Sequence, residues 1–287
     1  MSISIIIVTW NSEEYIEACL YSLDPQDEII VIDNASKDKT VEKVNTLFST
    51  VQMIRNSQNI GLSRAINQGA KIATGEYILL LNPDVVVMED TIAKMCKFML
   101  ERSGNPAPAG DDREDIGACA PRFLWPNGSV QRSCRELPTF KNLFIEFTGI
   151  GRLKKCPSWK MWNFNYTETK EVEQPMGSCL MIRKQVFDEI GGMNERYPIF
   201  MNDVDLCYRI KKAGYKIYFI AHANVIHYLG SSTRKVKRKM IIEEHRSMYR
   251  YLRDHFNNRC LVVLYGIILL TGAFARSLFS RVKSGNR

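Results

Sequence analysis

The first part of the chain alternates short, uniformly apolar runs with longer stretches of mixed polarity. The apolar runs have the length of strands and cover Ile3–Thr9, Ile29–Asp33, Val51–Ile54 and Tyr77–Leu81. The intervening stretches have the period of helices, around residues 12–22, 38–49, 62–73 and 90–101. This alternation predicts βαβ units and a parallel sheet, and strands that are apolar throughout predict helices on both faces of it. The expected fold class is therefore α/β with a mostly parallel central sheet.

The pattern is less regular in the second half. Residues 103–115 combine proline, glycine and acidic residues, and they predict a solvent-exposed loop. The elements expected beyond this loop are strands near 118–124, 178–182, 215–220 and 224–228 and a helix at about 203–213.

The end of the chain changes character. A basic stretch at 234–239 precedes the 16 uncharged residues Cys260–Ala275. As a helix this apolar segment is about 24 Å long, shorter than a hydrocarbon core of roughly 30 Å. We expect it to lie in, or dip into, one leaflet of a membrane beside the basic residues; a helix packed on the protein's own core is the alternative. The expected organisation is a main domain over residues 1–230 and a helical extension over 231–287.

The net charge and the cysteine pattern limit the classes of binding partner and the cellular compartment that we expect. The net charge of +8 favours nucleic acid, an anionic bilayer surface or a phosphorylated small molecule. The basic stretch has no interleaved aromatic residues and stands beside an apolar segment, so lipid or phosphate is favoured over nucleic acid. The cysteines have no metal-ligand or redox spacing, and residues 1–10 lack the features of a secretory signal. We therefore expect the chain on the cytosolic side.

Polar residues stand where the apolar runs end, and open parallel sheets bind ligands at that edge. They are Thr9 and Asn11 at the end of the first run, Asp33 at the end of the second, and Asn82–Asp84 after the fourth. The turn after the first run has no glycine, and no GxGxxG occurs elsewhere. A nicotinamide or flavin enzyme of the Rossmann type is therefore not expected.

Each of these groups also has a purely structural explanation. Asp33 suits a hydrogen bond to the base or ribose of a nucleoside, but an Asx turn over residues 33–36 would use the same carboxylate. Asp84 and Asn82 offer the hard oxygen ligands that hold Mg²⁺ or Mn²⁺ against a diphosphate. The sequence Asn-Pro-Asp is, however, also typical of a turn.

Two acidic residues and one histidine complete the candidate chemistry. Asp203 and Asp205 stand just before a predicted helix, where one can act as a general base and the other as a helix cap or dipole partner; caps for both are the structural alternative. His227 ends a short apolar run, and a lone histidine at such a place is commonly structural. Function is favoured by the order of these features along the chain rather than by any one of them.

Taken together, these segments resemble the family 2 inverting glycosyltransferases over roughly residues 3–255. The matching segments are Ile5–Asn11, Val31–Ser36, Asn59–Leu62, Leu80–Val85, Gly177–Arg183, Gly191–Glu195 and Asn202–Leu206. The Leu-Asn-Pro-Asp form, Pro126–Gln131 and Val225–Tyr228 are most similar to the rhamnosyltransferase-like branch. The resemblance implies a GT-A fold, in which a Rossmann-like, mostly parallel sheet carries helices on both faces and forms the catalytic domain.

The resemblance implies a nucleotide-binding role for the residues at the first two strand ends. Asp33 would contact the nucleoside of a nucleotide-diphosphate sugar donor. Thr9, Asn11 and Asn59 would line the same pocket.

The resemblance also implies a metal site and a base. Asp84 would bind a divalent metal, Mg²⁺ or Mn²⁺, on the donor's diphosphate. Asn82 would stand at the first position of the DxD-type motif, and His227 would complete the metal shell. Asp203 would be the catalytic base, which removes a proton from the acceptor hydroxyl while the metal neutralises charge on the leaving diphosphate.

Two positions depart from the family pattern. Asn82 replaces the more usual aspartate and removes one negative charge from the metal site. Asn202 replaces the acidic residue that often precedes the base. Without a carboxylate neighbour, Asp203 is expected to be the better ionised and the weaker base.

The implied substrates are a nucleotide-sugar donor, with dTDP-rhamnose as the candidate, and a saccharide acceptor on a lipid carrier, used in bacterial surface-polysaccharide synthesis. Two other classes remain open. A sugar nucleotidyltransferase would be expected to carry a glycine- and lysine-rich loop after the first strand, which this chain lacks. A non-catalytic nucleotide-sugar-binding module would keep Asp33 and Asp84 without needing Asp203.

Overall fold

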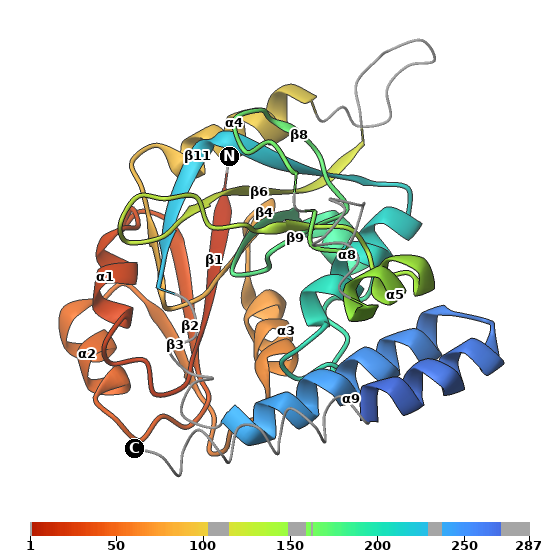
Figure 1. Cartoon of the computed structure of the whole chain (residues 1–287). Helices are drawn as coiled ribbons and strands as arrows, with labels where there is room; N and C mark the ends of the chain where they lie inside the picture. Colours follow the sequence, from red (N-terminus) through yellow and green to blue (C-terminus); the bar gives the residue numbers. More distant parts are fainter. Residues whose placement is uncertain (1, 103–114, 149–158, 162, 229–236, 271–287) are drawn as a thin grey trace.

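The computed structural model describes residues 2–102, 115–148, 159–161, 163–228 and 237–270 (Figure 1). Within these residues nine strands form one sheet, and two short strands form a separate ribbon. The sheet has the order β3-β2-β1-β4-β10-β6-β11-β5, with β8 paired to β11. Its strands are β1 (Ile3–Thr9), β2 (Glu28–Asp33), β3 (Gln52–Arg55), β4 (Tyr77–Leu81), β5 (Val85–Val87), β6 (Ile116–Leu124), β8 (Lys170–Glu171), β10 (Cys179–Arg183) and β11 (Lys216–His227). The ribbon consists of β7 (Cys134–Arg135) and β9 (Gln174–Pro175).

Most strands of the sheet point the same way. Strands β3, β2, β1 and β4 pair in parallel, and β10 lies antiparallel between β4 and β6. Because β6 is thus aligned with the first four strands and β11 is parallel to β6, only β10, β5 and β8 of the described sheet run in the opposite direction. The predicted α/β class with a mostly parallel sheet is confirmed.

Helices cover both faces of the sheet, as the apolar strands predict. Successive residues of a strand point to opposite faces, so Ile5 and Ile7 of β1 lie in one core cluster and Ile6 in another. Helices α1, α2 and α4 pack into the first cluster, and α3, α7 and α8 into the second. The bounds are α1 (Ile16–Tyr21), α2 (Thr40–Leu47), α3 (Leu62–Ile72), α4 (Thr91–Arg102), α7 (Lys184–Glu189) and α8 (Asn202–Lys212).

A third core cluster joins the C-terminal helices to the rest of the molecule. It contains residues of α5 (Phe140–Thr148), α8, α9 (Lys237–His255) and a last helix at 259–270, which runs beside α9 in Figure 1. Val204 of α8, Tyr251 of α9 and Tyr265 of the last helix are all buried in it. The helix at 259–270 therefore belongs to the same core as the helix that carries Asp203.

The last helix has a second, exposed apolar face. Val263, Leu264, Ile267 and Leu270 are 57, 51, 56 and 71% exposed, and their spacing puts them on one side of the helix. Packing on the protein's own core, the alternative offered by the sequence, is thus realised for one face only. No described helix is long and apolar enough to cross a membrane.

One sequence prediction in the second half is wrong in detail. The strands expected near 215–220 and 224–228 are the single strand β11, whose register with β6 shifts between Ile220 and Asn224. An irregularity of this kind interrupts the apolar pattern without ending the strand. The loop predicted at 103–115 lies outside the described residues except for Asp115, and so do residues 234–236 of the basic stretch.

Candidate active site

Thr9 and Asp33 meet at the carboxyl edge of the sheet. Strands β1 and β2 place Thr9 directly opposite Asp33, and the Thr9 hydroxyl donates to Asp33 Oδ1 at 3.0 Å. Both side chains are buried. A carboxylate oxygen accepts more than one hydrogen bond, so Asp33 keeps acceptor capacity for a ligand.

The turn after Asp33 uses its other oxygen. The Ser36 N–H donates to Asp33 Oδ2 at 3.0 Å, which is the Asx-type turn that the sequence offered as an alternative. Asn11, with a left-handed φ of 53°, ties the first loop to this turn. Its N–H donates to Ser36 Oγ at 2.9 Å, and its side-chain oxygen accepts from the Lys37 N–H at 2.7 Å. Three of the predicted nucleotide-binding residues, Thr9, Asn11 and Asp33, are therefore brought together.

Asn59 belongs to a neighbouring loop. Its side chain is exposed, and its oxygen accepts from the Gly61 N–H at 3.0 Å. The Gly61 carbonyl accepts in turn from Asn34 Nδ2 at 3.2 Å. Asn59 thus reaches the turn that contains Asp33 through Gly61.

Asp84 and His227 form a buried pair beside β5. Val85, the first residue of β5, lies opposite His227 of β11, and the Tyr228 N–H donates to the Asp84 carbonyl at 3.0 Å. Nε2 of His227 lies 3.5 Å from Oδ1 of Asp84. The two predicted metal ligands, far apart in sequence, are therefore neighbours.

Gln131 sets the orientation of the histidine ring. Its Oε1 lies 2.8 Å from Nδ1 of His227, so Nδ1 carries a hydrogen, and in the neutral ring the lone pair of Nε2 then points toward Asp84. A lone pair and a carboxylate at 3.5 Å repel each other unless a proton or cation lies between them. Gln131 is 3% exposed, and its Nε2 has no hydrogen-bond partner among the described residues. The amide therefore stays at this position at a cost in stability.

The pair is suited to a divalent cation. Two ligands of one ion, each about 2.1 Å from it, lie up to about 4.2 Å apart, and the separation of 3.5 Å fits within that range. No group of three His, Cys, Asp or Glu side chains gathers to hold a metal in the described part of the chain. Two protein ligands are nevertheless usual where phosphate oxygens and water complete the shell of Mg²⁺.

Asn82 links the metal side of the site to the base. Its N–H donates to the Ser178 carbonyl at 2.8 Å, and its Nδ2 donates to Ser178 Oγ at 3.0 Å. The residue before Ser178 is Gly177, whose N–H donates to Asp203 Oδ2 at 3.3 Å. Two consecutive residues therefore bridge Asn82 and Asp203, which the sequence predicted separately.

Asp203 fits its position only because residue 177 is glycine. A Cβ at 177 would lie 2.7 Å from the Cβ of Asp203, closer than carbon atoms pack. Gln174 Nε2 donates to the same Oδ2 at 3.2 Å, and the Val204 N–H donates to Oδ1 at 2.9 Å. The carboxylate is held by donors on both oxygens.

The environment of Asp203 shifts its pKa. Burial raises the pKa of Asp203 above its ordinary value, because the ionised form loses solvation, while the Gly177 N–H and the positive charge of Arg135 oppose the shift. The expectation that Asn202 leaves Asp203 better ionised than an acidic neighbour would concerns a different comparison, and it stays a prediction. A raised pKa makes Asp203 the stronger base.

The expectation that Asp203 or Asp205 caps the helix is wrong, whereas both lie in the first turn of α8, as the dipole-partner alternative requires. The N-cap of α8 is Met201, at a left-handed φ of 64°, and no side chain caps it. Asp205 is fully buried, where it accepts from Arg209 Nε at 2.7 Å and lies 2.8 Å from His255 Nε2. Burial alone would raise the pKa of Asp205, but these two partners hold it below its ordinary value. Asp205 thus has a structural role, because its contacts hold the helix that carries the candidate base.

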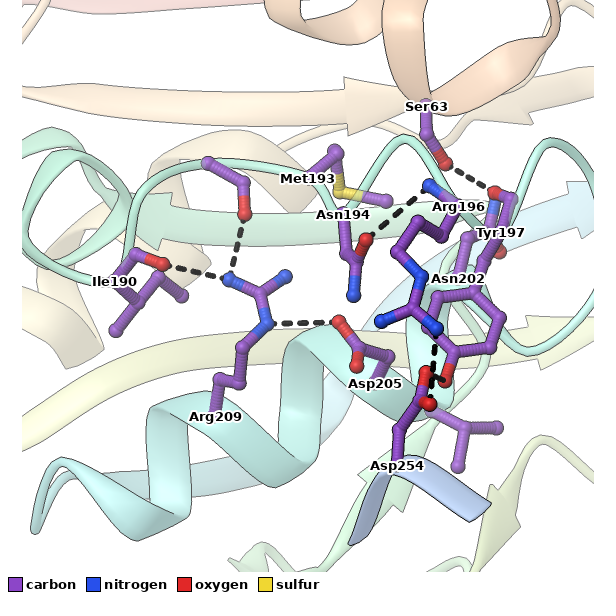
Figure 2. A network of polar contacts seen from close by, with 12 residues as sticks. Ser63, Ile190, Met193, Asn194, Arg196, Tyr197, Asn202, Asp205, Arg209 and Asp254 are labelled. Carbon is purple, nitrogen blue, oxygen red and sulfur yellow. Dashed lines mark hydrogen bonds and ion pairs between the residues drawn. The ribbon is translucent and has the colours of Figure 1, made fainter. Parts of the chain in front are cut away.

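Polar contacts around Asp205 fix the helix that carries the candidate base (Figure 2). Arg209 also donates to two backbone carbonyls of the loop at 190–192, at 2.8 and 2.7 Å. Asp254 of α9 accepts from Arg196 at 3.0 Å and from the Tyr197 hydroxyl at 2.9 Å. Helix α8, the loop before it and α9 are therefore held as one unit.

The sequence did not point to Gln131, Gln174 or Gly177 as site residues. Gly177 opens a segment that matches the family pattern, so its identity was a usable signal. Gln131 ends the Pro126–Gln131 stretch, but nothing in that stretch indicates a histidine partner. Gln174 carries no local signal, because its role depends on the pairing of β9.

Known proteins give a consistent picture. The model of the family described as Glycosyl transferase family 2 matches residues 4–116. N-acetylglucosaminyl-diphospho-decaprenol L-rhamnosyltransferase of Mycobacterium tuberculosis (strain CDC 1551 / Oshkosh) is 26% identical over 87% of this chain and 83% of its own length. Rhamnosyltransferase WbbL of Escherichia coli (strain K12) is 25% identical over 86% of this chain and 91% of its own length. The predicted resemblance is confirmed, and these two relatives extend it over Asp203 and His227, which the family model does not reach.

Solved structures share the fold. Mannosyltransferase PcManGT from Pyrobaculum calidifontis, in complex with GDP-Man and Mn²⁺, has a TM-score of 0.58 at 16% identity, over 98% of this chain and 75% of that one. GalNAc-T7 with UDP, GalNAc and Mn²⁺ has a TM-score of 0.56 at 19% identity, over 79% of this chain and 44% of that one. This chain therefore spans less than half of GalNAc-T7, and the likeness concerns the GT-A fold.

Proposed function

We propose a specific reaction for this chain, which is a rhamnosyltransferase-like family 2 glycosyltransferase: it transfers a hexose, with inversion, from a nucleotide-diphosphate donor to a saccharide acceptor. Asp203 is the general base of the transfer. Asp84 and His227 hold a divalent metal, and Asn82 supports that site. Thr9, Asn11, Asp33 and Asn59 bind the nucleotide.

One observation carries this proposal: the metal side and the base side of the site share a short hydrogen-bonded connection. Asn82 bonds Ser178, and the adjacent Gly177 bonds Asp203. Inverting transfer is an in-line displacement, so the leaving diphosphate and the attacking hydroxyl must stand on opposite sides of one carbon atom. A donor site and a base joined through residues 177–178 support that arrangement.

The chain's own residues supply the proton transfer. Asp203, whose pKa is raised by burial, accepts the proton of the acceptor hydroxyl as the oxygen attacks the anomeric carbon. Gln174 and the Gly177 N–H hold the carboxylate at that position. A divalent metal bound by Asp84 and His227 would neutralise the charge that develops on the leaving diphosphate.

The relatives suggest the substrates. Both are named as rhamnosyltransferases, and the mycobacterial one as acting on N-acetylglucosaminyl-diphospho-decaprenol. We propose dTDP-rhamnose as the donor and a lipid-diphosphate-linked saccharide as the acceptor, in bacterial surface-polysaccharide synthesis. The +8 charge of the chain suits both anionic substrates.

A lipid-linked acceptor requires access to a membrane surface. We propose that residues 1–230 are the catalytic domain and that residues 231–287 hold it at the cytosolic face of the membrane. The exposed apolar face of the helix at 259–270 supports this role.

The first test is thermal stabilisation by a panel of nucleotide sugars, including dTDP-rhamnose and UDP-sugars, with Mn²⁺, Mg²⁺ or a chelator. A donor at about 100 times its Kd adds about 2.7 kcal/mol of stability. We expect one donor to stabilise the protein in a metal-dependent manner, and Asp84→Ala to abolish the metal dependence. No response to any donor would overturn the donor site. A protein that binds a donor but transfers no sugar, and whose donor affinity is the same in Asp203→Asn, would instead be a non-catalytic binding module.

A further inference from the structure

Arg135 stands beside the candidate base without a role in the mechanism described so far. It lies on β7, directly opposite Gln174 of β9. Gln174 Nε2 bonds Asp203 Oδ2 at 3.2 Å. The cross-strand pairing therefore places Arg135 beside Gln174, which itself bonds the carboxylate that takes the proton.

The guanidinium of Arg135 lies over an aromatic ring. Its central carbon is 4.8 Å from the ring centroid of Trp159, and the Glu136 N–H donates to the Trp159 carbonyl at 3.0 Å. None of the guanidinium N–H groups donates a hydrogen bond to a described residue, so these donors are available to a ligand. The half-buried Arg135 makes no ion pair within the described part of the chain, in contrast to Arg209 and Arg196.

Trp159 adds a second donor without a partner. Its indole N–H is buried and finds no acceptor among the described residues. A buried donor left without an acceptor costs stability, and a bound oxygen atom would remove that cost. The pair thus combines a positive charge that has no ion-pair partner among the described residues with an unsatisfied donor.

The position of Arg135 along its segment indicates which substrate it meets. Gln131 contacts His227 at the metal side, and Arg135 lies four residues further on, opposite Gln174 at the base side. Four residues of extended chain span up to about 13 Å. In an in-line displacement the donor's diphosphate leaves on the metal side and the acceptor enters on the base side, so Arg135 belongs to the acceptor.

We propose that Arg135, placed over the ring of Trp159, binds an anionic group of the acceptor, namely a phosphate or diphosphate attached to the sugar that is glycosylated. This proposal rests on the proposed transfer reaction for its choice of substrate. A planar guanidinium with free edge donors binds phosphate oxygens in a bidentate manner, which a lysine does not reproduce.

Kinetics with two acceptors test the proposal. One acceptor carries a diphosphate and a short prenyl chain, and the other is the same sugar as a neutral alkyl glycoside. For Arg135→Gln we expect KM for the diphosphate acceptor to rise roughly 10- to 100-fold, with KM for the neutral acceptor little changed. Because Arg135 also opposes the rise in the pKa of Asp203, any change in kcat should be the same for both acceptors. Arg135→Lys should recover part of the loss in KM, and Arg132→Gln, at an exposed neighbour, should behave as wild type. An equal change in KM for both acceptors, or a shifted pH profile with unchanged KM, would overturn the proposal and make Arg135 a residue that tunes Asp203 alone.

A binding measurement separates this proposal from the transfer reaction. Farnesyl diphosphate is titrated into wild type, Arg135→Gln and Arg132→Gln with a chelator present, so that the metal site cannot hold its diphosphate. Thermal stabilisation of wild type and Arg132→Gln that is lost in Arg135→Gln supports the anion site even if no donor supports transfer. Equal stabilisation of all three proteins, or none, contradicts it even if transfer is established.

Discussion

Single residues decide the chemistry of this site, and Asp203 shows how. Its pKa is raised by burial, so the folded state binds the proton more tightly than the unfolded chain does. A group of this kind contributes stability that is present below its unfolded pKa and is lost as pH rises through the folded pKa. The same desolvation that makes Asp203 a stronger base therefore lowers the free energy of unfolding near neutral pH.

Asp203→Asn should separate these two effects. The amide cannot ionise, so the stability of the variant relative to wild type should increase as pH rises from about 4 to about 8. Transfer should fall about 10²- to 10⁴-fold because the general base is gone, while donor binding is kept. Thermal unfolding of both proteins across this pH range and single-turnover transfer at one pH are the measurements. A relative stability that declines with rising pH would contradict the raised pKa.

Gln131 likewise orients the ring of His227 at a cost in the stability of the protein. Gln131→Leu removes the buried amide nitrogen that has no partner and also the oxygen that holds Nδ1–H of His227. The histidine can then take the other tautomer and donate from Nε2 to Asp84. We expect thermal stability close to that of wild type and an affinity for Mn²⁺ reduced about 10- to 100-fold, measured from the electron paramagnetic resonance of free Mn²⁺.

The matched control is Gln131→Glu, which keeps an acceptor for Nδ1–H and should keep the affinity for Mn²⁺. If Gln131→Leu bound Mn²⁺ as well as wild type, the histidine would not depend on this contact and the ligand assignment of His227 would lose its main geometric support.

The sequence located the residues at strand ends and could not locate their partners. Thr9, Asp33 and Asp84 stand at positions that the strand pattern marks directly. Gln131 contacts His227 from 96 residues away, and Gln174 reaches Asp203 only through the pairing of β9 with β7. Such contacts depend on tertiary packing, which leaves no local pattern.

At the scale of elements, side chains of α9 hold α8 in place, and we call these contacts the α9 brace. Nε2 of His255 lies 2.8 Å from Oδ1 of Asp205. The centroid of the His255 ring is 4.2 Å from that of Tyr208 and 4.6 Å from that of Tyr251. Removing a partner from a buried carboxylate leaves part of its desolvation uncompensated. The basic helix of the C-terminal extension therefore contributes to the position of the base.

His255→Ala should weaken this brace. We expect a loss of about 1–3 kcal/mol in the free energy of unfolding and slower transfer. Donor affinity should be unchanged, because the nucleotide residues lie on β1, on β2, in the loops after them and in the loop before α3. Urea unfolding and donor titration measure the two quantities, and Asn257→Ala, at an exposed position, is the control. A variant with normal stability and normal turnover would show that α9 does not support α8.

Elements with a long apolar pattern were the predictable ones. The first four strands and the helices between them were expected close to their observed bounds. Strands β1, β2 and β4 are buried along nearly their whole length, whereas the edge strand β3 is short and partly exposed. Strands β7 and β9 have two residues each, too few to show a period of two. They are nevertheless the elements that position Arg135 and Gln174 beside Asp203.

At the scale of the whole molecule, the last described helix faces two ways. Val262, Tyr265 and Leu269 complete the third core cluster, while Val263, Leu264, Ile267 and Leu270 are exposed. Removing the segment after Asn258 would therefore strip the cluster and the exposed face together. Loss of membrane binding in such a truncation would not distinguish a missing membrane contact from a damaged fold.

Substitution of exposed residues avoids that ambiguity. Leu264→Gln with Ile267→Gln changes side chains that are 51 and 56% exposed, so thermal stability should be close to that of wild type. Removing two apolar side chains from a bilayer interface should weaken binding to anionic vesicles roughly 10- to 100-fold, as measured by flotation. Leu100→Gln, at a position on α4 that is 59% exposed, removes a comparable side chain elsewhere and should float as wild type does. If wild type and the double variant float equally, the exposed face does not meet the membrane, and access to a lipid-linked acceptor must depend on another part of the chain.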